Sequence, residues 1–291
     1  MCLKRIGIIG GDQRQICVTQ FLEEQGWQTE TAYLPTGPGQ EETAGQLQKV
    51  FENCRIVVLP VPVLRKGVLN TCTEHKPDAE QIVNCIKHGH RIFGGCFSKE
   101  LKQEILHRGG MVYDLMDSEN VIKENAAATA EGAIAEAVRS SLVTLRGNRC
   151  ILTGYGRCGS AIHRCLKSWG CEIVVYDSDT DACERAKKAG AVICSRENLF
   201  PMLKNTAFIF NTAPSLVWTE ELLQELSEKV CMLELASVPG GIDRDAAARL
   251  GVCVTFLPGL PGRFSPETSG RLFGREILKE IEKSKKRECN R

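Results

Sequence analysis

The chain has 291 residues, enough for about two domains that each enclose a hydrophobic core. Its 37 basic and 36 acidic residues are well mixed, so no charge pattern indicates binding to nucleic acid or to an anionic membrane. The longest apolar runs, such as residues 56–59, are far too short to span a bilayer, and the N-terminus lacks the apolar region of a secretory signal. We expect a cytoplasmic protein.

Fifteen cysteines is a high number, but it is odd, and no Cys-x-x-Cys pair occurs. Many of them lie within apolar patterns, so we expect small core residues in a reducing cell and predict neither a disulfide scaffold nor a metal site. Cys158 differs because it lies in a glycine-rich loop before a predicted helix. A reactive thiol is possible at such a place, although we favour an unreactive one.

The first third of the chain alternates between strand and helix patterns. An apolar strand over residues 5–9 runs into Gly10-Gly11-Asp12-Gln13-Arg14-Gln15, and a helix is predicted from there to Gln25. Further strands are predicted at residues 29–33, 55–59, 91–93 and 111–113, with helices near 40–51, 79–88 and 98–108. This alternation predicts a mostly parallel sheet with helices on both faces. The first turn lacks a full three-glycine pattern, so we expect it to face a cleft and not to bind a second dinucleotide.

A long helix is predicted next, over residues 125–138, with Thr129 able to cap its start. Its place before the next strand indicates that it crosses from a first domain, residues 1–124, to a second, residues 125–270. The C-terminal helix, residues 271–291, is expected to rejoin the first domain.

The most informative stretch is the turn Gly154-Tyr155-Gly156-Arg157-Cys158-Gly159, between an apolar strand at 150–152 and a helix over 160–170. In such turns the first glycine permits the tight bend, the second lets the backbone approach a pyrophosphate, and the third lets helix and strand pack closely. A second strand, 172–176, ends at Asp177, about 20 residues past the loop, where an acid binds ribose hydroxyls. The pattern predicts a dinucleotide site, and Asp177 favours NAD over NADP.

The remaining elements complete this second domain. Strands are predicted at residues 191–194, 208–210, 230–235 and 252–256, with helices at 181–189, 195–203 and about 268–282. Ligands of parallel sheets collect where strands end, so the segments after two of these strands are expected to line the cofactor site: Asn211, Thr212, Pro214, Ala236 and Ser237. The predicted fold class is α/β, with two Rossmann-like doubly wound parallel-sheet domains joined by a long crossing helix.

Taken together, the sequence motifs of this chain resemble those of one family, the A subunits of dipicolinate synthase from spore-forming bacteria. The resemblance covers nearly the whole chain and rests on Ile8–Gln15, Leu59–Val61, Ala130–Ile134, Gly154–Gly159, Asn211–Pro214, Leu235–Asp243 and Leu257–Gly262. The Gly-Gly-Asp-x-Arg, Ala-Ser-x-Pro-Gly-Gly and Pro-Gly-Leu-Pro-Gly runs are much more specific than the cofactor loop.

The resemblance implies a two-domain dehydrogenase, with a homodimer core, that works with the flavoprotein-like B subunit of dipicolinate synthase in the mother cell of a sporulating bacterium. It implies oxidation of dihydrodipicolinate, or of its hydroxy-tetrahydro precursor from the lysine pathway, to pyridine-2,6-dicarboxylate with hydride transfer to NAD or NADP. Two positions matter here. Val238 stands where a basic residue is expected in much of the family, and Asp177 favours NAD although some relatives are suited to NADP.

A cyclic dicarboxylate substrate needs cations, and arginine binds carboxylates bidentately. Arg14 and Arg263 are candidates because each lies in a loop at a strand end or a glycine-rich turn, although each could equally face solvent. Arg65 and Lys66 come next.

A proton must also be removed from the substrate. Asp12, Glu131 and Glu267 are candidate bases near predicted cleft loops, and their order stays open. Asp12 could instead cap the following helix, and Glu131 could position a loop. His163 lies on the cofactor helix and is expected to be structural.

Two other functions are considered. A 2-hydroxy-acid dehydrogenase would place an arginine at the position of Val238 and a histidine after the last strand, but residues 257–266 contain no histidine. A non-catalytic nucleotide sensor would bind the cofactor and show no turnover.

Overall fold

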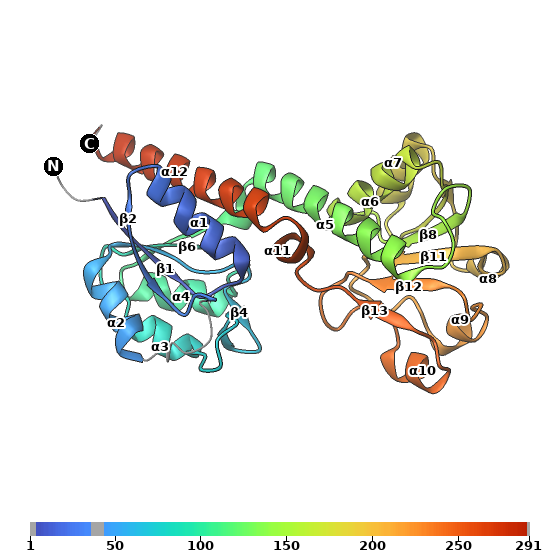
Figure 1. Ribbon diagram of the computed structural model, residues 1–291, viewed down its shortest axis with the longest axis horizontal. Coiled ribbons are helices and arrows are strands. Elements are labelled where there is room, and N and C mark those ends of the chain that lie inside the picture. Colours follow the sequence, from blue (N-terminus) through green and yellow to red (C-terminus); the bar gives the residue numbers. More distant parts are fainter. Residues whose placement is uncertain (1–3, 36–43, 290–291) are drawn as a thin grey trace. The chain divides into compact units, whose positions relative to one another are not determined.

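The computed structural model describes residues 4–35 and 44–289. The chain divides into two compact units: a first unit, Met1–Glu124 with Ser265–Arg291, and a second unit, Asn125–Phe264 (Figure 1). The return to the first unit comes at 264/265, a few residues before the expected 270/271. The last helix, α12 (Pro266–Cys289), begins at Pro266, and proline is well suited to the first turn of a helix.

The sheet of the first unit is parallel, with strand order β2-β1-β3-β6-β7. Its strands are β1 (Arg5–Ile9), β2 (Gln28–Ala32), β3 (Ile56–Val58), β6 (Arg91–Gly94) and β7 (Met111–Asp114). Its helices are α1 (Gln13–Glu24), α2 (Ala44–Asn53), α3 (Ala79–Asn84) and α4 (Lys99–His107), followed by the short 3₁₀ helix η1 (Leu115–Asp117). This order is that of flavodoxin-like doubly wound sheets.

Alternating side chains of these strands build two cores. Ile6 and Ile8 pack with residues of α1 and α12, whereas Ile9 and Val57 pack with residues of α2, α3 and α4. Figure 1 shows α1 and α12 on one side of this sheet and α2 and α3 on the other. The sequence did not reveal the short antiparallel hairpin of β4 (Leu64–Arg65) and β5 (Val68–Leu69).

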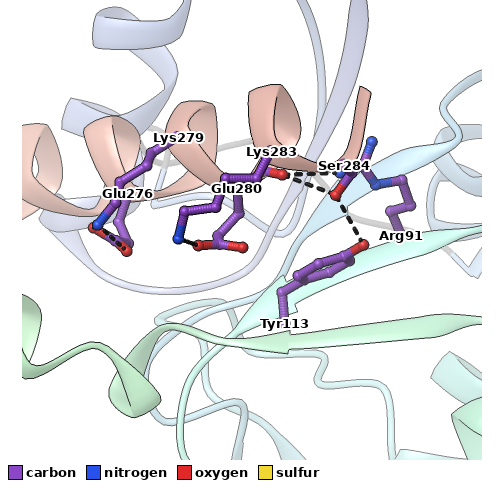
Figure 2. Close-up of polar contacts among 7 residues, drawn as sticks. All are labelled: Arg91, Tyr113, Glu276, Lys279, Glu280, Lys283 and Ser284. Atoms are coloured by element: carbon purple, nitrogen blue, oxygen red, sulfur yellow. Dashed lines mark hydrogen bonds and ion pairs between the residues drawn. The ribbon is translucent and has the colours of Figure 1, made fainter. Parts of the chain in front are cut away.

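Helix α12 is held closely to the first unit. A Cβ on Gly270 would lie 2.5 Å from Cys17 Cβ, and one on Gly274 would lie 2.3 Å from the Phe21 ring, so both glycines are needed for its approach to α1. Figure 2 shows the other end of this helix, where Ser284 Oγ lies 3.3 Å from the hydroxyl of Tyr113 on β7. The C-terminal helix is therefore an integral layer of the first unit.

The second unit contains a six-stranded parallel sheet in the order β10-β9-β8-β11-β12-β13. Its strands are β8 (Arg149–Thr153), β9 (Glu172–Tyr176), β10 (Val192–Ile193), β11 (Thr206–Asn211), β12 (Cys231–Glu234) and β13 (Val254–Phe256). Its helices include α6 (Arg157–Ser168), α7 (Thr180–Ala189) and α8 (Leu199–Leu203). Numbered within the unit, the order is 3-2-1-4-5-6, which is the Rossmann order. The predicted fold class is confirmed.

The crossing helix is also confirmed, but its predicted start was wrong. Helix α5 (Glu119–Ser140) begins six residues earlier than expected and so contains residues of both units. Thr129 does not cap it. Its hydroxyl instead donates to the Asn125 carbonyl 2.8 Å away, the bond that a threonine inside a helix makes.

Several short elements were missed. Helix α8 covers only the second half of the predicted 195–203, and three helices of five or six residues were not expected: α9 (Glu220–Gln224), α10 (Arg244–Arg249) and α11 (Leu260–Phe264). Such helices are too short to show a clear apolar period. Within residues 4–35 and 44–289, no helix combines the length and apolar character needed to cross a membrane.

Candidate functional site

The glycine-rich loop connects β8 to α6. At two of its positions, the packing of the protein leaves room only for glycine. Gly154 has φ +87°, and a Cβ there would lie 2.6 Å from Thr212 Oγ1. A Cβ on Gly159 would lie 2.1 Å from the Gly154 carbonyl oxygen. The first contact reflects the tight turn at Gly154 and the second the close packing of α6, both of which the sequence pattern predicts.

Gly156 differs, because nothing lies within 4 Å of a Cβ added to it. It is the N-cap of α6, with φ −74°, and no side chain makes a capping hydrogen bond there. The fold therefore places no steric demand on this glycine. The open space at a helix N-terminus, with its partial positive charge, fits the pyrophosphate of a dinucleotide.

Asp177 directly follows β9 and lies against this loop. Its Oδ2 accepts a hydrogen bond from the Tyr155 backbone N–H at 2.6 Å, and its Oδ1 accepts one from the Asp179 N–H at 2.9 Å. Asp179 in turn caps α7 by accepting from the Asp181 N–H at 3.0 Å. The half-buried carboxylate of Asp177 is thus held in a fixed orientation where the Rossmann pattern places a ribose-binding acid.

The side chains of the loop also contribute to its shape. Tyr155 is buried, and its hydroxyl lies 2.7 Å from Nδ1 of His163 on α6. Burial lowers the pKa of His163, which fits the structural role expected for it. Burial also raises the pKa of the Cys158 thiol, so the structure gives no sign of an activated nucleophile there.

A buried polar network lies where β8, β11 and β12 end, and the sequence did not reveal it. Thr153 Oγ1 donates to Asn211 Oδ1 at 2.5 Å and accepts from Trp218 Nε1 at 3.1 Å. Asn211 Nδ2 donates to Glu234 Oε1 at 2.7 Å and to the Ala213 carbonyl at 3.0 Å. All four side chains are buried, so the Asn211 amide, expected to line the cofactor site, is committed within the protein.

The other predicted cofactor residues lie in the segments after these strands. Thr212 is half-buried, and its hydroxyl lies 3.0 Å from the Gly154 carbonyl, to which it donates. Pro214 and Ser237 are exposed, whereas Ala236 is half-buried and its N–H donates to Glu234 Oε1 at 2.9 Å. Thr212 is therefore the member of this set in direct contact with the glycine loop.

In the first unit the structure brings Asp12 and Arg14 together. Arg14 Nε and Nη2 donate to the two Asp12 carboxylate oxygens at 2.9 and 2.8 Å, and Nη2 also donates to the Val61 carbonyl at 2.7 Å. Asp12 caps α1 as well, by accepting from the Arg14 N–H at 3.0 Å. Burial alone would raise the pKa of the Asp12 carboxyl, but the bonds and charge of Arg14, with Arg65, hold that pKa below its ordinary value.

Arg263 and Glu131, the two catalytic candidates of the second unit, have different surroundings. Arg263 Nη2 donates at 2.7 Å to Oε1 of Glu136, a buried carboxylate on α5 that also pairs with Arg139 at 2.6 Å. Glu131 is exposed on the same helix. No hydrogen bond or ion pair joins Glu131 to Arg263 in the described part of the chain.

The remaining candidates lie in the first unit. Arg65 and Lys66 belong to the β4–β5 hairpin, where Lys66 has φ +52°. Glu267, exposed in the first turn of α12, pairs with Arg271 at 3.2 Å. Among residues 4–35 and 44–289, no three His, Cys, Asp or Glu side chains are grouped so that they could hold a metal ion.

Comparison with known proteins gives matches for both units of the chain. Residues 5–116 match the family model for the N-terminal domain of the dipicolinate synthase A subunit. The chain is 26% identical to the A subunit of dipicolinate synthase from Bacillus subtilis over 287 residues, which cover 94% of this chain and 95% of the relative. The resemblance to the A subunits of dipicolinate synthase is confirmed.

Solved structures show the same fold. The structure of the dipicolinate synthase A subunit from Bacillus halodurans superimposes with a TM-score of 0.81 at 24% identity, covering 96% of this chain and 97% of that one. A transhydrogenase from Sinorhizobium meliloti has a TM-score of 0.65 at 12% identity, covering 96% and 92%.

The second unit contains a dehydrogenase-type domain. Residues 113–229 match the family model for the NAD binding domain of D-isomer specific 2-hydroxyacid dehydrogenases. This match supports an oxidoreductase that uses a nicotinamide dinucleotide, in agreement with the geometry of the glycine loop.

Proposed function

We propose that the chain is the dehydrogenase component of a dipicolinate synthase. It would oxidise dihydrodipicolinate, or the hydroxy-tetrahydro precursor with loss of one water, to pyridine-2,6-dicarboxylate during sporulation. Oxidation of the dihydro compound removes one hydride and one proton, and a bound NAD or NADP would supply the hydride acceptor. The observation that carries the proposal is the open face of Gly156 at the N-terminus of α6, in a chain that resembles the A subunits of dipicolinate synthase over almost its full length.

The second unit would hold the cofactor. The loop Gly154–Gly159 fits a pyrophosphate because its two outer glycines are packed against protein and its middle glycine faces open space. Asp177 would bind the adenosine ribose, and its negative charge would favour NAD because it would repel the additional phosphate of NADP. Thr212 and the exposed Ser237 lie in segments that would border the bound dinucleotide.

The first unit would hold the substrate. Arg14 offers a guanidinium where two strands end, and Asp12 fixes its orientation through both carboxylate oxygens. Because the pKa of Asp12 is lowered, we assign it to holding Arg14 and not to accepting a substrate proton. Glu267 of the first unit and Glu131 of the second, both exposed, remain candidate bases, and Arg14 is the candidate ligand for a substrate carboxylate.

The 2-hydroxy-acid dehydrogenase alternative has the match of residues 113–229 in its favour. That match concerns the cofactor domain and carries no substrate-binding arginine or catalytic histidine. The corresponding positions hold the exposed Val238 and the histidine-free segment 257–266, so we favour the cyclic dicarboxylate.

We further propose that the protein forms a homodimer and acts in the mother-cell cytoplasm with the flavoprotein-like B subunit of dipicolinate synthase. The Bacillus subtilis relative is named for its place as the A subunit of a synthase, which supports a second, different component.

A reconstitution assay tests the proposal. The purified chain, with and without the B subunit, is mixed with freshly generated lysine-pathway intermediate and NAD or NADP. Absorbance is then followed for pyridine dicarboxylate and for reduced cofactor. Both signals should rise together. If neither appears in the reconstituted pair although NADH still binds, the chain is a nucleotide sensor and the dehydrogenase proposal is wrong.

A further inference from the structure

Glu234 is a buried carboxylate at the end of β12 that neither the sequence pattern nor the proposed chemistry uses. Its side chain takes three hydrogen bonds, all from N–H donors. Asn211 Nδ2 at 2.7 Å and the Ala236 N–H at 2.9 Å donate to Oε1, and the Gly241 N–H at 3.0 Å donates to Oε2. Only a side chain with acceptors at both terminal atoms can accept all three hydrogen bonds, and a carboxylate has two such oxygens.

These bonds shape the segment that leaves β12. Gly240 has φ +83°, and a Cβ there would lie 2.9 Å from Glu234 Oε2. A Cβ on Gly241 would lie 2.6 Å from both the Ala213 carbonyl and Asn211 Nδ2. Residues 235–241 are therefore folded around the Glu234 carboxylate and against the turn that follows β11.

The same network reaches the glycine loop. Asn211 Nδ2 donates to the Ala213 carbonyl, and Ala213 N lies 2.8 Å from the position of a Cβ on Gly154. Thr212 donates its N–H to the Thr153 carbonyl at 2.7 Å and its hydroxyl to the Gly154 carbonyl at 3.0 Å. A continuous chain of contacts thus runs from Glu234 to the start of the glycine loop.

We infer that Glu234 is a positioning residue for the dinucleotide site. It sets two walls of that site, residues 211–215 and 235–241, and acts on the cofactor only through them. This inference rests on the proposed function, because it assumes that the glycine loop binds a nicotinamide dinucleotide. It makes the network of Thr153, Asn211, Trp218 and Glu234 part of the cofactor machinery and not only of the core.

The main test is Glu234→Gln, which has the same shape. Whichever way the new amide is turned, its NH2 group faces an N–H donor, either Gly241 or the pair Asn211 and Ala236. Because a buried unsatisfied donor is costly, the segments that carry these N–H groups should shift to relieve it, and NADH should bind about tenfold or more weakly in a fluorescence titration. The titration is run well below the melting temperature of every variant.

Two further variants keep the test decisive. Thr153→Val removes the hydroxyl between Asn211 and Trp218, and should weaken NADH binding about three- to tenfold even if Glu234→Gln does not fold. Leu222→Ala is the matched control, since Leu222 is fully buried in the same unit and has no polar role. It should lower the melting temperature and leave the NADH dissociation constant unchanged.

The outcomes separate the two claims. If the parent protein binds neither NADH nor NADPH, the proposed function fails. If the parent binds NADH and both network variants bind it with the parent affinity, the inference about Glu234 is wrong and the proposed function stands. An equal loss of affinity in Leu222→Ala would show a general effect of stability, which also overturns the inference.

Discussion

Alanine at Gly156 separates the cofactor role of the glycine loop from its folding role. The φ of Gly156 is −74°, which other residues adopt, and an added Cβ meets no atom within 4 Å. Alanine is a poorer N-cap than glycine, which costs up to about 1 kcal/mol, but it also restricts the unfolded chain, which contributes about 0.4–1 kcal/mol. Gly156→Ala should therefore melt within about 4 °C of the parent.

Binding should respond very differently. A methyl group in this space would hold a pyrophosphate away from the N–H groups of the first turn of α6. Loss of one charge-assisted hydrogen bond, about 1.5–3 kcal/mol, corresponds to about ten- to hundredfold weaker binding of NADH. Fluorescence titration with NADH and thermal denaturation, both on the same preparations, measure the two effects.

Gly159→Ala is the matched control. Its Cβ would lie 2.1 Å from the Gly154 carbonyl oxygen, so the helix must move, at a cost of about 1–3 kcal/mol. The melting temperature of Gly159→Ala should therefore fall clearly below that of the parent and of Gly156→Ala. NADH binding by Gly156→Ala that equals the parent's would refute the placement of a pyrophosphate on this loop. A melting temperature as low as that of Gly159→Ala would refute the argument from open space.

Four further substitutions test single groups. Asp177→Asn removes the charge and leaves one of the two N–H donors without an acceptor, so affinity for both cofactors can fall, but the preference for NADH over NADPH should fall about tenfold in paired titrations. Arg263→Met leaves Glu136 paired with Arg139. It should lower the free energy of unfolding, measured with denaturant, by about 1 kcal/mol or less and leave the substrate KM unchanged. The pKa of Asp12 is lower in the folded protein than its ordinary value of 3.8. The stability that this gives is complete above pH 3.8 and is lost as the pH falls through the pKa of the folded state. Asp12→Asn should therefore flatten the decline of the melting temperature below about pH 4. Burial lowers the pKa of His163 from 6.5, so stability falls as the pH drops below that value, and His163→Gln should weaken this dependence.

The sequence predicted the features that depend on local pattern. The glycine spacing, the apolar strands and the acid after β9 each follow from a short run of residues, and the structure places them as the Rossmann pattern requires. Doubly wound sheets follow in turn, because strands that alternate with helices pair in parallel.

Features that depend on distant partners were not predictable in this way. Arg263 follows a proline- and glycine-rich loop, and its partner Glu136 lies 127 positions earlier in the chain, so the sequence pattern could not reveal their ion pair. Glu234 ends an apolar strand and resembles an ordinary surface acid until β11 brings Asn211 beside it. A periodic spacing of Gly270 and Gly274 was present in the sequence, and could have signalled the close approach of α12 to another helix.

Both candidate sites lie where the order of strands reverses. In the first unit β1 lies between β2 and β3, and Arg14 spans the segments after β1 and β3 by donating to Val61. In the second unit β8 lies between β9 and β11, and Thr212 after β11 contacts Gly154 after β8. Loops that leave such neighbouring strands toward opposite faces open a crevice in which ligands bind.

The two crevices differ in the charge that they offer. The first contains the buried guanidinium of Arg14, a planar group whose N–H donors suit carboxylates and already bind that of Asp12. The second contains a glycine loop with Arg157 in it and the N-terminus of a twelve-residue helix, which together suit a pyrophosphate. Under the proposed function, one fold principle, used twice with different side chains, would serve two different anions. A dehydrogenase that oxidises a dicarboxylate with a dinucleotide needs this combination, whereas a nucleotide sensor would have no use for the buried arginine of the first unit.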